Sequence, residues 1–174
     1  VQTYTEAIQK FTLNNSGATL SYSGYEKITD PIHLHRRDYN LLSHIFPDGS
    51  EGLVISSGVF QQFVDLPFLY PAAIKEDGYV AKTECNQYLN NYHTAHTNIY
   101  DSLENKMTSL FFGGISQYYY VDGALHQDDF VPFVNTISGI SRDNSGNLTE
   151  FYIPTGMPGY KGSSAEFLPN YNLT

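Results

Sequence analysis

The clearest pattern of hydrophobic and polar positions lies between residues 130 and 156. Two β-prone runs flank a short polar turn at Gly146. Asn and Gly tolerate positive φ in such turns, and β-branched and aromatic residues suit a pleated surface. In the second run Thr149, Phe151 and Ile153 fall on one face of an extended strand. The pattern therefore predicts a β-hairpin near the C-terminal end.

The first half of the chain favours helices. Residues 3–12 place apolar side chains at helical spacing, and a second helix is predicted from about 36 to 46, after the helix-starting pair Asp30-Pro31. Residues 53–64 are a strand candidate interrupted by a glycine, and residues 65–82 are expected to form a covering loop.

Residues 84–112 allow two interpretations. Apolar residues at helical spacing run from Cys85 to Leu110, which would give one long helix. Several Asn and Thr residues in this stretch are mediocre helix formers. We favour a short helix to Tyr92 followed by a strand at 93–100, a turn and a strand at 107–122, with Gly113-Gly114 as a bulge or bend. The fold class predicted is α+β.

Length and charge limit the function classes. The 174 residues suit a single domain, with a core at about 1–156 and an irregular tail at 157–174, and no internal repeat is visible. The net charge of −9, with only 9 Lys and Arg, disfavours nucleic acid and an anionic membrane surface as partners. No phosphate-cradling glycine loop indicates a cofactor, so none is expected. The single Cys85 excludes an internal disulfide, and cytoplasmic and secreted locations both stay open.

Two short motifs resemble the nuclear transport factor 2-like cone fold, in its SnoaL-like and scytalone-dehydratase-like branches. Residues 38–48, Asp-Tyr-Asn-Leu-Leu-Ser-His-Ile-Phe-Pro-Asp, look like the second-helix phrase of that superfamily. Residues 144–152, Asn-Ser-Gly-Asn-Leu-Thr-Glu-Phe-Tyr, look like its terminal hairpin. Pro154-Thr155 follows where the family commonly has an Asp, and residues 65–82 and the tail lack a counterpart.

The resemblance implies N-terminal helices packed in a strongly curved antiparallel sheet that forms a cone-shaped pocket. A single SnoaL-like domain over residues 1–174 would bind a small hydrophobic molecule there and form a homodimer. The aromatic surplus, 15 Tyr and 11 Phe, would line the cone.

Three residues are candidates for acid–base catalysis. A histidine side chain can both give and take a proton, and His96 matches the place of a pocket histidine in scytalone-dehydratase-like proteins. Asp38 matches a pocket carboxylate of the family, and it could orient His35 or act as a base; a helix-start acid is the plainer interpretation. His93 and His96 would share a helix face and could bind a metal, but they would point apart on a strand, and no metal site is predicted.

Five further residues are candidates for substrate binding: His93, Asn135, Tyr118, Tyr120 and Tyr92. Asn135 lies among apolar neighbours and must be hydrogen-bonded if buried, either to a ligand or to backbone. Tyr118 and Tyr120 share a strand face and could donate to a carbonyl oxygen, although core packing explains them as well.

The leading hypothesis is a cofactor-independent enzyme for isomerisation, cyclisation or dehydration of a small hydrophobic carbonyl compound. It depends on the resemblance alone. A non-catalytic small-molecule-binding domain and a dimerising interaction domain are the alternatives. A catalytic pocket should hold a histidine and an aspartate within hydrogen-bonding distance.

Overall fold

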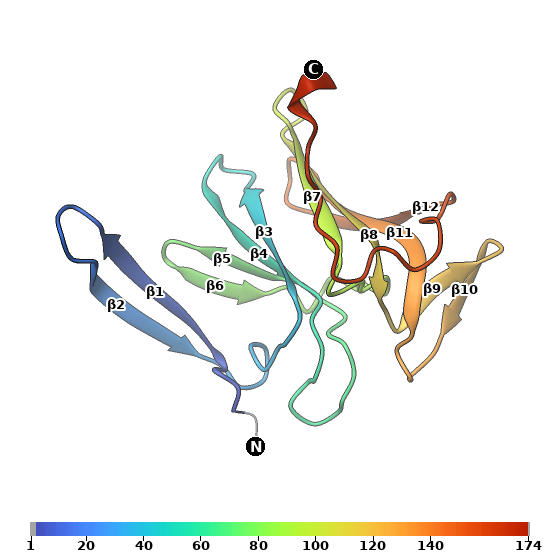
Figure 1. Cartoon of the computed structure of the whole chain (residues 1–174), viewed down its shortest axis with the longest axis horizontal. Helices are drawn as coiled ribbons and strands as arrows, with labels where there is room; N and C mark the ends of the chain where they lie inside the picture. The colour runs from blue at the N-terminus through green and yellow to red at the C-terminus, as the bar shows by residue number, and fades with distance from the viewer. Residues whose placement is uncertain (1–2, 174) are drawn as a thin grey trace.

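The fold is built from strands. The computed structural model describes residues 3–173, and the helical element in that range is one 3-10 turn, η1 (Tyr171–Leu173). Two four-stranded antiparallel sheets and two separate hairpins make up the chain (Figure 1). The first sheet contains β3 (Asn40–Ile45), β4 (Glu51–Ser56), β5 (Ala72–Lys75) and β6 (Gly78–Ala81); the second contains β7 (Ala95–Asp101), β8 (Lys106–Ile115), β11 (Phe133–Arg142) and β12 (Leu148–Ile153). The hairpins are β1 (Ala7–Asn14) with β2 (Ser21–Thr29), and β9 (Tyr118–Val121) with β10 (Ala124–Gln127).

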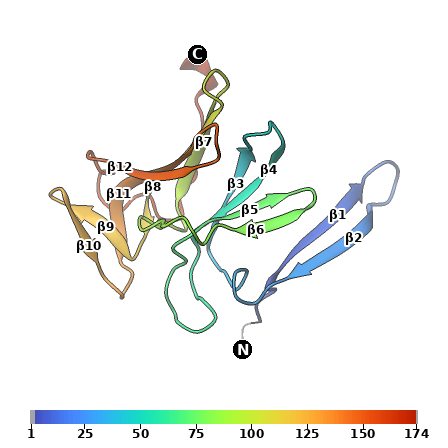
Figure 2. The ribbon, with the colours of Figure 1, turned by 180° about the vertical axis from the view of Figure 1, so that it is seen from behind.

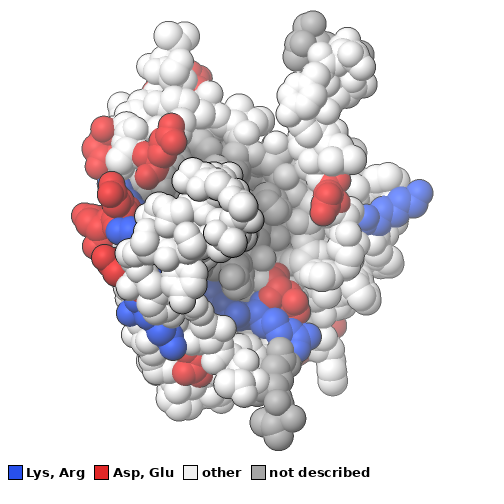
Figure 3. Space-filling view, turned by 60° about the vertical axis from the view of Figure 1, so that its left-hand side comes forward, with Lys and Arg blue, Asp and Glu red and all other residues white. Residues whose placement is uncertain are grey.

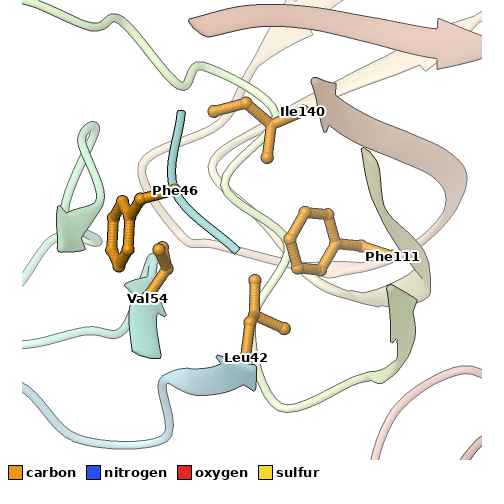
Figure 4. Packing of buried hydrophobic residues seen from close by; sticks show 5 residues of the cluster. All are labelled: Leu42, Phe46, Val54, Phe111 and Ile140. Atoms are coloured by element: carbon orange, nitrogen blue, oxygen red, sulfur yellow. The ribbon is translucent and has the colours of Figure 1, made fainter. Parts of the chain in front are cut away.

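The main apolar core lies between the two sheets. Leu42, Phe46 and Val54 of the first sheet pack against Phe111 and Ile140 of the second (Figure 4). Phe111 is fully buried. Full burial of a side chain of this kind contributes about 1.5–3 kcal/mol. Leu42 is supplied by β3, in which every second residue from Asn40 to His44 is buried, so one face of this strand forms half of the core.

Residues 82–94 connect β6 to β7 and link both sheets through buried polar side chains; we call them the buried polar segment. Its Asn91 side chain donates to the carbonyl oxygens of Gly113 (2.6 Å) and Thr136 (3.1 Å) in and beside the second sheet. Its Asn91 carbonyl accepts from Asn40 of β3 at 2.8 Å. The neighbouring Asn90 is also fully buried, and its side-chain oxygen accepts from Ser116 at 2.8 Å. In this segment, hydrogen bonds from side-chain amides therefore take the place of the backbone hydrogen bonds that join strands in a sheet.

The two sheets share a local design that the sequence does not reveal. In both, the chain adopts positive φ two residues before the first strand, at Asp38 (φ 56°) and at His93 (φ 51°). The residues just before, Arg37 and Tyr92, form isolated antiparallel bridges with Val59 and Ile115 respectively.

The second strand of each sheet also ends alike. Ser57-Gly58 follows β4 and Gly113-Gly114 lies near the end of β8, and both pairs have consecutive positive φ values. Each sheet is a meander that follows chain order, with β9–β10 inserted in the second between β8 and β11. We therefore describe the sheets as two copies of one structural repeat.

The hairpin β1–β2 lies on the other face of the first sheet (Figures 1 and 2). Ile8 of β1 packs against the buried residues Leu34, Ile55 and Ala72. Lys10 of β1 donates from Nζ to the carbonyl oxygen of Glu76 at 2.7 Å, in the turn between β5 and β6. On this face of the first sheet, the hairpin therefore covers the part that contains β5.

The predicted α+β fold is wrong. The expected helix at 3–12 is part of β1, and the expected helix at about 36–46 contains β3. The expected helix ending at Tyr92 is the buried polar segment, and the predicted covering loop at 65–82 contains the hairpin β5–β6. Without helices there is no helix-packed cone for the chain to form.

Other expectations are confirmed. The hairpin within residues 130–156 is β11–β12, and the second interpretation of residues 84–112 correctly gave the paired strands β7 and β8. Gly113-Gly114 lies beside a register shift between β8 and β11, as expected of a bulge. In the described part of the chain, no helix has the length and apolar character needed to cross a membrane.

Candidate functional site

A cavity of about 560 Å³ lies between the two sheets. The first sheet contributes residues from all four of its strands, and the second contributes β8, β11, β12 and the turn that joins β11 to β12. The lining is His44, Phe46, Pro47, Val54, Ser56, Pro71, Ala73, Lys75, Asp77, Gly78, Tyr79, Val80, Lys82, Ser109, Ile140, Arg142, Ser145, Gly146 and Leu148. The wall is largely apolar, and its core residues are those that hold the sheets together.

Arg142 and His44 are two buried basic side chains of this wall, whose polar residues also include Ser56, Ser109 and Tyr79. Arg142, at the end of β11, is 2% exposed, and His44, on β3, is 8% exposed. The Arg142 guanidinium donates to the carbonyl oxygens of Asn105, Ile45 and Asp143. Among the described residues, no carboxylate bonds to Arg142, so its buried positive charge is offset by carbonyl dipoles and by the side-chain oxygen of Asn105.

The His44 imidazole is neutral at ordinary pH. Burial, together with the positive Arg142, lowers the pKa of His44 to about 4. Its ring lies 4.9 Å from the ring of Phe46. Among the described residues, neither His44 Nδ1 nor Arg142 Nε has a hydrogen-bond partner. These two nitrogens are therefore unsatisfied polar atoms next to a cavity.

Opposite charges line part of the cavity rim. Lys75 Nζ lies 2.7 Å from Asp48 Oδ2, and Lys82 Nζ lies 3.6 Å from Glu84 Oε1. The hydrogen bond from Lys75 holds the pKa of Asp48 well below its usual range. Both lysines are balanced in this way, which leaves Arg142 as the cation of the cavity without an acidic partner among the described contacts.

A second cavity of about 380 Å³ contains two of the predicted substrate-binding residues, Tyr120 and Asn135. The ring of Tyr120 stacks on that of Tyr152, with centroids 3.7 Å apart and planes 9° apart. The backbone N–H of Tyr120 donates to Thr136 Oγ1 at 3.0 Å. The structure therefore brings Tyr120 and Asn135 together, at the junction of β9, β11 and β12, away from the inter-sheet cavity.

The three predicted catalytic residues line neither cavity. His96 lies on β7 with its Nδ1 3.2 Å from the carbonyl oxygen of Thr94. Asp38 precedes β3 and accepts from Arg37 Nε at 3.0 Å. His35 pairs with Glu6, not with Asp38, at 2.6 Å between Nδ1 and Oε1, and the ring of Tyr4 stacks on it at 4.0 Å.

The remaining predicted binding residues have packing roles. His93 hydrogen-bonds through Nε2 to Ser164 Oγ, and so fixes the C-terminal tail over β7. Tyr92 is buried, and burial raises its pKa to about 12. Tyr118 meets Tyr88 edge-on with ring centroids 5.1 Å apart. Within residues 3–173, no group of three or more His, Cys, Asp or Glu side chains could hold a metal ion.

The sequence argument missed His44 and Arg142. His44 alternates with Leu42 and Phe46 on the buried face of β3, a period-two signal that was present in the sequence. Arg142 is the last residue of a strand that was itself correctly predicted. Arg142 belongs to no motif, and His44 lies within the 38–48 phrase that was assigned to a helix, so only the alternation of β3 could have drawn attention to His44.

No known protein family, curated protein or solved structure matches this chain.

Proposed function

We propose that this chain binds a small molecule, without catalysing its conversion, in the cavity between the first and second sheets. The ligand class that fits is a compact apolar or aromatic body carrying one anionic or hydrogen-bond-accepting group. The observation that carries the proposal is the pair of buried nitrogens, His44 Nδ1 and Arg142 Nε, that lack partners in the wall of a cavity of about 560 Å³.

The cavity has the size and surface of a ligand site. Small-molecule sites span roughly 300–1,000 Å³ and combine apolar walls with a few polar groups. Here Phe46, Val54, Ala73 and Ile140 supply the apolar surface. An apolar ligand body would be bound by replacing water against these side chains, at about 25 cal/mol for each Å² of apolar surface removed from water.

The buried polar pair selects for an acceptor group. A buried polar atom without a partner costs about 1–3 kcal/mol. A carboxylate, sulfonate or carbonyl oxygen placed between His44 and Arg142 would remove that cost, and a negative group would also offset the guanidinium charge. A small rotation of the side chains is needed, because both nitrogens are covered in the ligand-free structure.

The neighbours of His44, an arginine and a phenylalanine, favour binding over catalysis. Arg142 and the ring of Phe46 lie beside His44. The histidine–carboxylate pair found among the described residues, His35 with Glu6, lies outside both cavities. A histidine whose pKa is lowered to about 4 is a poor general base near neutral pH. The acid–base enzyme expected from the resemblance depended on a cone-shaped pocket that this fold does not form.

The test is a fluorescence titration with the aromatic sulfonate 1-anilinonaphthalene-8-sulfonate as the probe. The native chain should bind one equivalent, and Ala73→Phe, which fills the cavity from β5, should weaken binding at least about tenfold. Ile74→Phe is the matched control, because it adds a ring to the same strand on the opposite face. Both variants should keep a cooperative urea transition, which separates site binding from dye uptake by a loosened fold.

Equal binding by both variants would refute the site. A ligand-induced shift of the His44 imidazole resonances, absent with the uncharged analogue N-phenyl-1-naphthylamine, would support the acceptor subsite. Identical shifts with both dyes would leave a purely apolar cavity and contradict the proposed role of Arg142.

A further inference from the structure

We propose that the second cavity, at the junction of β9, β11 and β12, binds a neutral saccharide. A pyranose ring has a face made of C–H groups and a rim of hydroxyls, so its site needs a flat apolar surface beside hydrogen-bonding side chains. The second cavity supplies both, and its volume of about 380 Å³ lies within the range of small-molecule sites. This site is separate from the inter-sheet cavity and does not depend on the ligand proposed there.

Tyrosine rings supply the flat surface. Tyr120 of β9 and Tyr152 of β12 both line the cavity, and their rings lie 3.7 Å apart and nearly parallel. Each ring covers one face of the other, so the stack orients both rings and leaves each an outer face that its neighbour does not cover. Tyr160 of the C-terminal tail also lines the cavity and is 67% exposed. Because the face of an aromatic ring is negative, it attracts the slightly positive C–H groups of a sugar.

Asn135 supplies the hydrogen-bonding groups closest to a bend in the sheet. The register between β8 and β11 shifts between Val134 and Ile137, and the bulge contains Asn135. Bulges commonly re-aim a side chain next to a functional site. The Asn135 side-chain amide has no hydrogen-bond partner among the described residues, although its backbone carbonyl accepts from the Met157 N–H at 2.7 Å. The amide therefore keeps N–H donors and an acceptor oxygen, which together match a pair of adjacent sugar hydroxyls.

The C-terminal tail holds Asn135 in position. A Cβ at Gly156 would lie 3.0 Å from the Asn135 carbonyl oxygen and 3.4 Å from Asn135 Nδ2, so the tail packs directly against this residue. Gly156 and Tyr160 of the same tail line the cavity. The polar group of the site is thus positioned before a ligand arrives, which lowers the ordering cost of binding.

The charges around the cavity favour a neutral ligand. Asp122, in the turn between β9 and β10, is the one charged residue among the described lining residues, which include no Lys, Arg or His. A phosphate or carboxylate would meet a like charge there and no cation. A carboxylate accepts hydrogen bonds, and sugar hydroxyls donate them, so Asp122 suits a saccharide.

An organic cation is the other ligand that tyrosine faces and a carboxylate could hold. The geometry of the rings favours the saccharide. The planes of Tyr120 and Tyr152 are only 9° apart, so the pair presents flat outer faces, whereas a cation is enclosed best by rings set at angles around it. Asp122 would be the counter-charge of a cation but only one of several hydrogen-bond acceptors for a sugar.

The test is titration calorimetry of the full chain with maltose, cellobiose and N,N′-diacetylchitobiose as probes. At least one of the three should bind with a dissociation constant of about 1 mM or lower. Tyr160→Ala and Asn135→Ala should each weaken that binding at least about tenfold. Both residues are exposed, and a cooperative urea transition for each variant shows that the fold is kept.

Tyr22→Ala is the matched control for Tyr160→Ala. Tyr22 of β2 is also 67% exposed, and it contacts the rings of Phe11 and Tyr25. Strand β2 lies at the opposite end of the molecule from β9 (Figure 1), on the side that Figure 3 brings forward with its broad uncharged areas. Sugar binding should be unchanged in this variant, whereas an equal loss in both would show unspecific stacking on exposed rings and overturn the proposal.

Two further variants separate the alternatives. Ala73→Phe, which fills the inter-sheet cavity, should leave sugar binding unchanged, and a loss would place the sugar in that cavity and overturn the proposal. Asp122→Asn keeps an acceptor oxygen, so it should weaken sugar binding by less than about threefold. Failure of all three sugars to bind would overturn the proposal, and tetramethylammonium binding that Asp122→Asn abolishes would then assign the site to an organic cation.

Discussion

Replacing Asn91 by alanine should destabilise the protein by about 2–6 kcal/mol, although the residue contributes nothing to the apolar core. Gly113 and Thr136 lie where the β8–β11 register shifts, so their carbonyl oxygens fall in a gap of the ladder. The Asn91 amide donates to both. Ser138 Oγ, which donates to Asn91 Oδ1 at 2.7 Å, has the Leu89 carbonyl as a second acceptor at 3.4 Å. Two carbonyls are therefore orphaned, at about 1–3 kcal/mol for a buried unsatisfied group.

Urea unfolding followed by far-ultraviolet circular dichroism measures this loss, with the slope of the transition checked for constancy. Asn98→Ala is the matched control, because its side chain donates a single hydrogen bond at 3.1 Å, to Ser43. That variant should lose about 1 kcal/mol or less. If the two variants lose the same stability, Asn91 does not satisfy the bulge, and the account of the buried polar segment as the link between the sheets is wrong.

Two other predictions follow from single contacts. Burial raises the pKa of Glu150 to about 7, while its Oε1 accepts from the Leu89 N–H at 2.8 Å. Because the folded state binds a proton that the unfolded state releases, the free energy of unfolding should fall as pH rises from about 4.5 to about 7. Glu150→Gln should remove that fall in urea transitions measured across this pH range. A Cβ at Gly162 would lie 1.7 Å from the Phe112 carbonyl oxygen, whereas one at Gly159 would meet nothing within 4 Å but would be held at a φ of 67°. Gly162→Ala should therefore cost about 1–3 kcal/mol from the clash and expose the tail after residue 156 to limited proteolysis. Gly159→Ala adds backbone strain of about 1–2 kcal/mol without a clash, so it should expose the tail less, and equal exposure by both variants would contradict the packed tail.

Strands were predicted correctly from the sequence where the alternation of apolar and polar residues fitted a strand and did not also fit a helix. β11–β12 combines β-branched and aromatic runs with a Gly turn, so local chemistry and tertiary structure agree. The prediction for β3 was wrong because two adjacent apolar residues, Leu41 and Leu42, resemble part of the apolar face of a helix. In the structure Leu42 is buried and Leu41 is half exposed, so the pair divides between the two faces of a strand.

Non-local hydrogen bonds explain the other errors. The segment ending at Tyr92 has apolar residues at helical spacing, but Asn91 is held by Gly113 of β8 and Asn90 by Gln117, in the connection between β8 and β9. The structural repeat was invisible for a related reason. It resides in backbone φ, which Asp38 and His93 adopt alike although their side chains differ. No pattern of residue types reports such a match.

The candidate site was only partly within reach of sequence reasoning. Tyr120 and Asn135 line one cavity, whereas His96, Asp38 and His35 contact separate partners and line neither cavity. Their proposed grouping came from the cone fold, and no physical argument from spacing supported it. His44 and Arg142 needed the strand register, because the two residues are far apart in the chain and meet only across the sheets.

The fold alone explains why there is a cavity but not what lines it. The sheets are joined at β3 and β7, where the Asn98 side chain donates to the Ser43 carbonyl oxygen. Arg142 makes a second connection, because it donates to the carbonyl oxygens of Ile45, at the end of β3, and of Asn105, in the β7–β8 turn. Between these ties the facing sheets leave a gap, which apolar side chains could have closed or lined at no electrostatic cost. Arg142 has a structural task that accounts for its terminal nitrogens, yet that task leaves its Nε, and the nearby His44 Nδ1, without partners. A wall that needed only to close the gap would gain stability from an apolar residue at position 44. The retention of a buried, neutral imidazole there is what makes ligand recognition the better explanation, and His44→Phe tests it: a more stable chain that no longer discriminates the sulfonate probe from its uncharged analogue is the expected result.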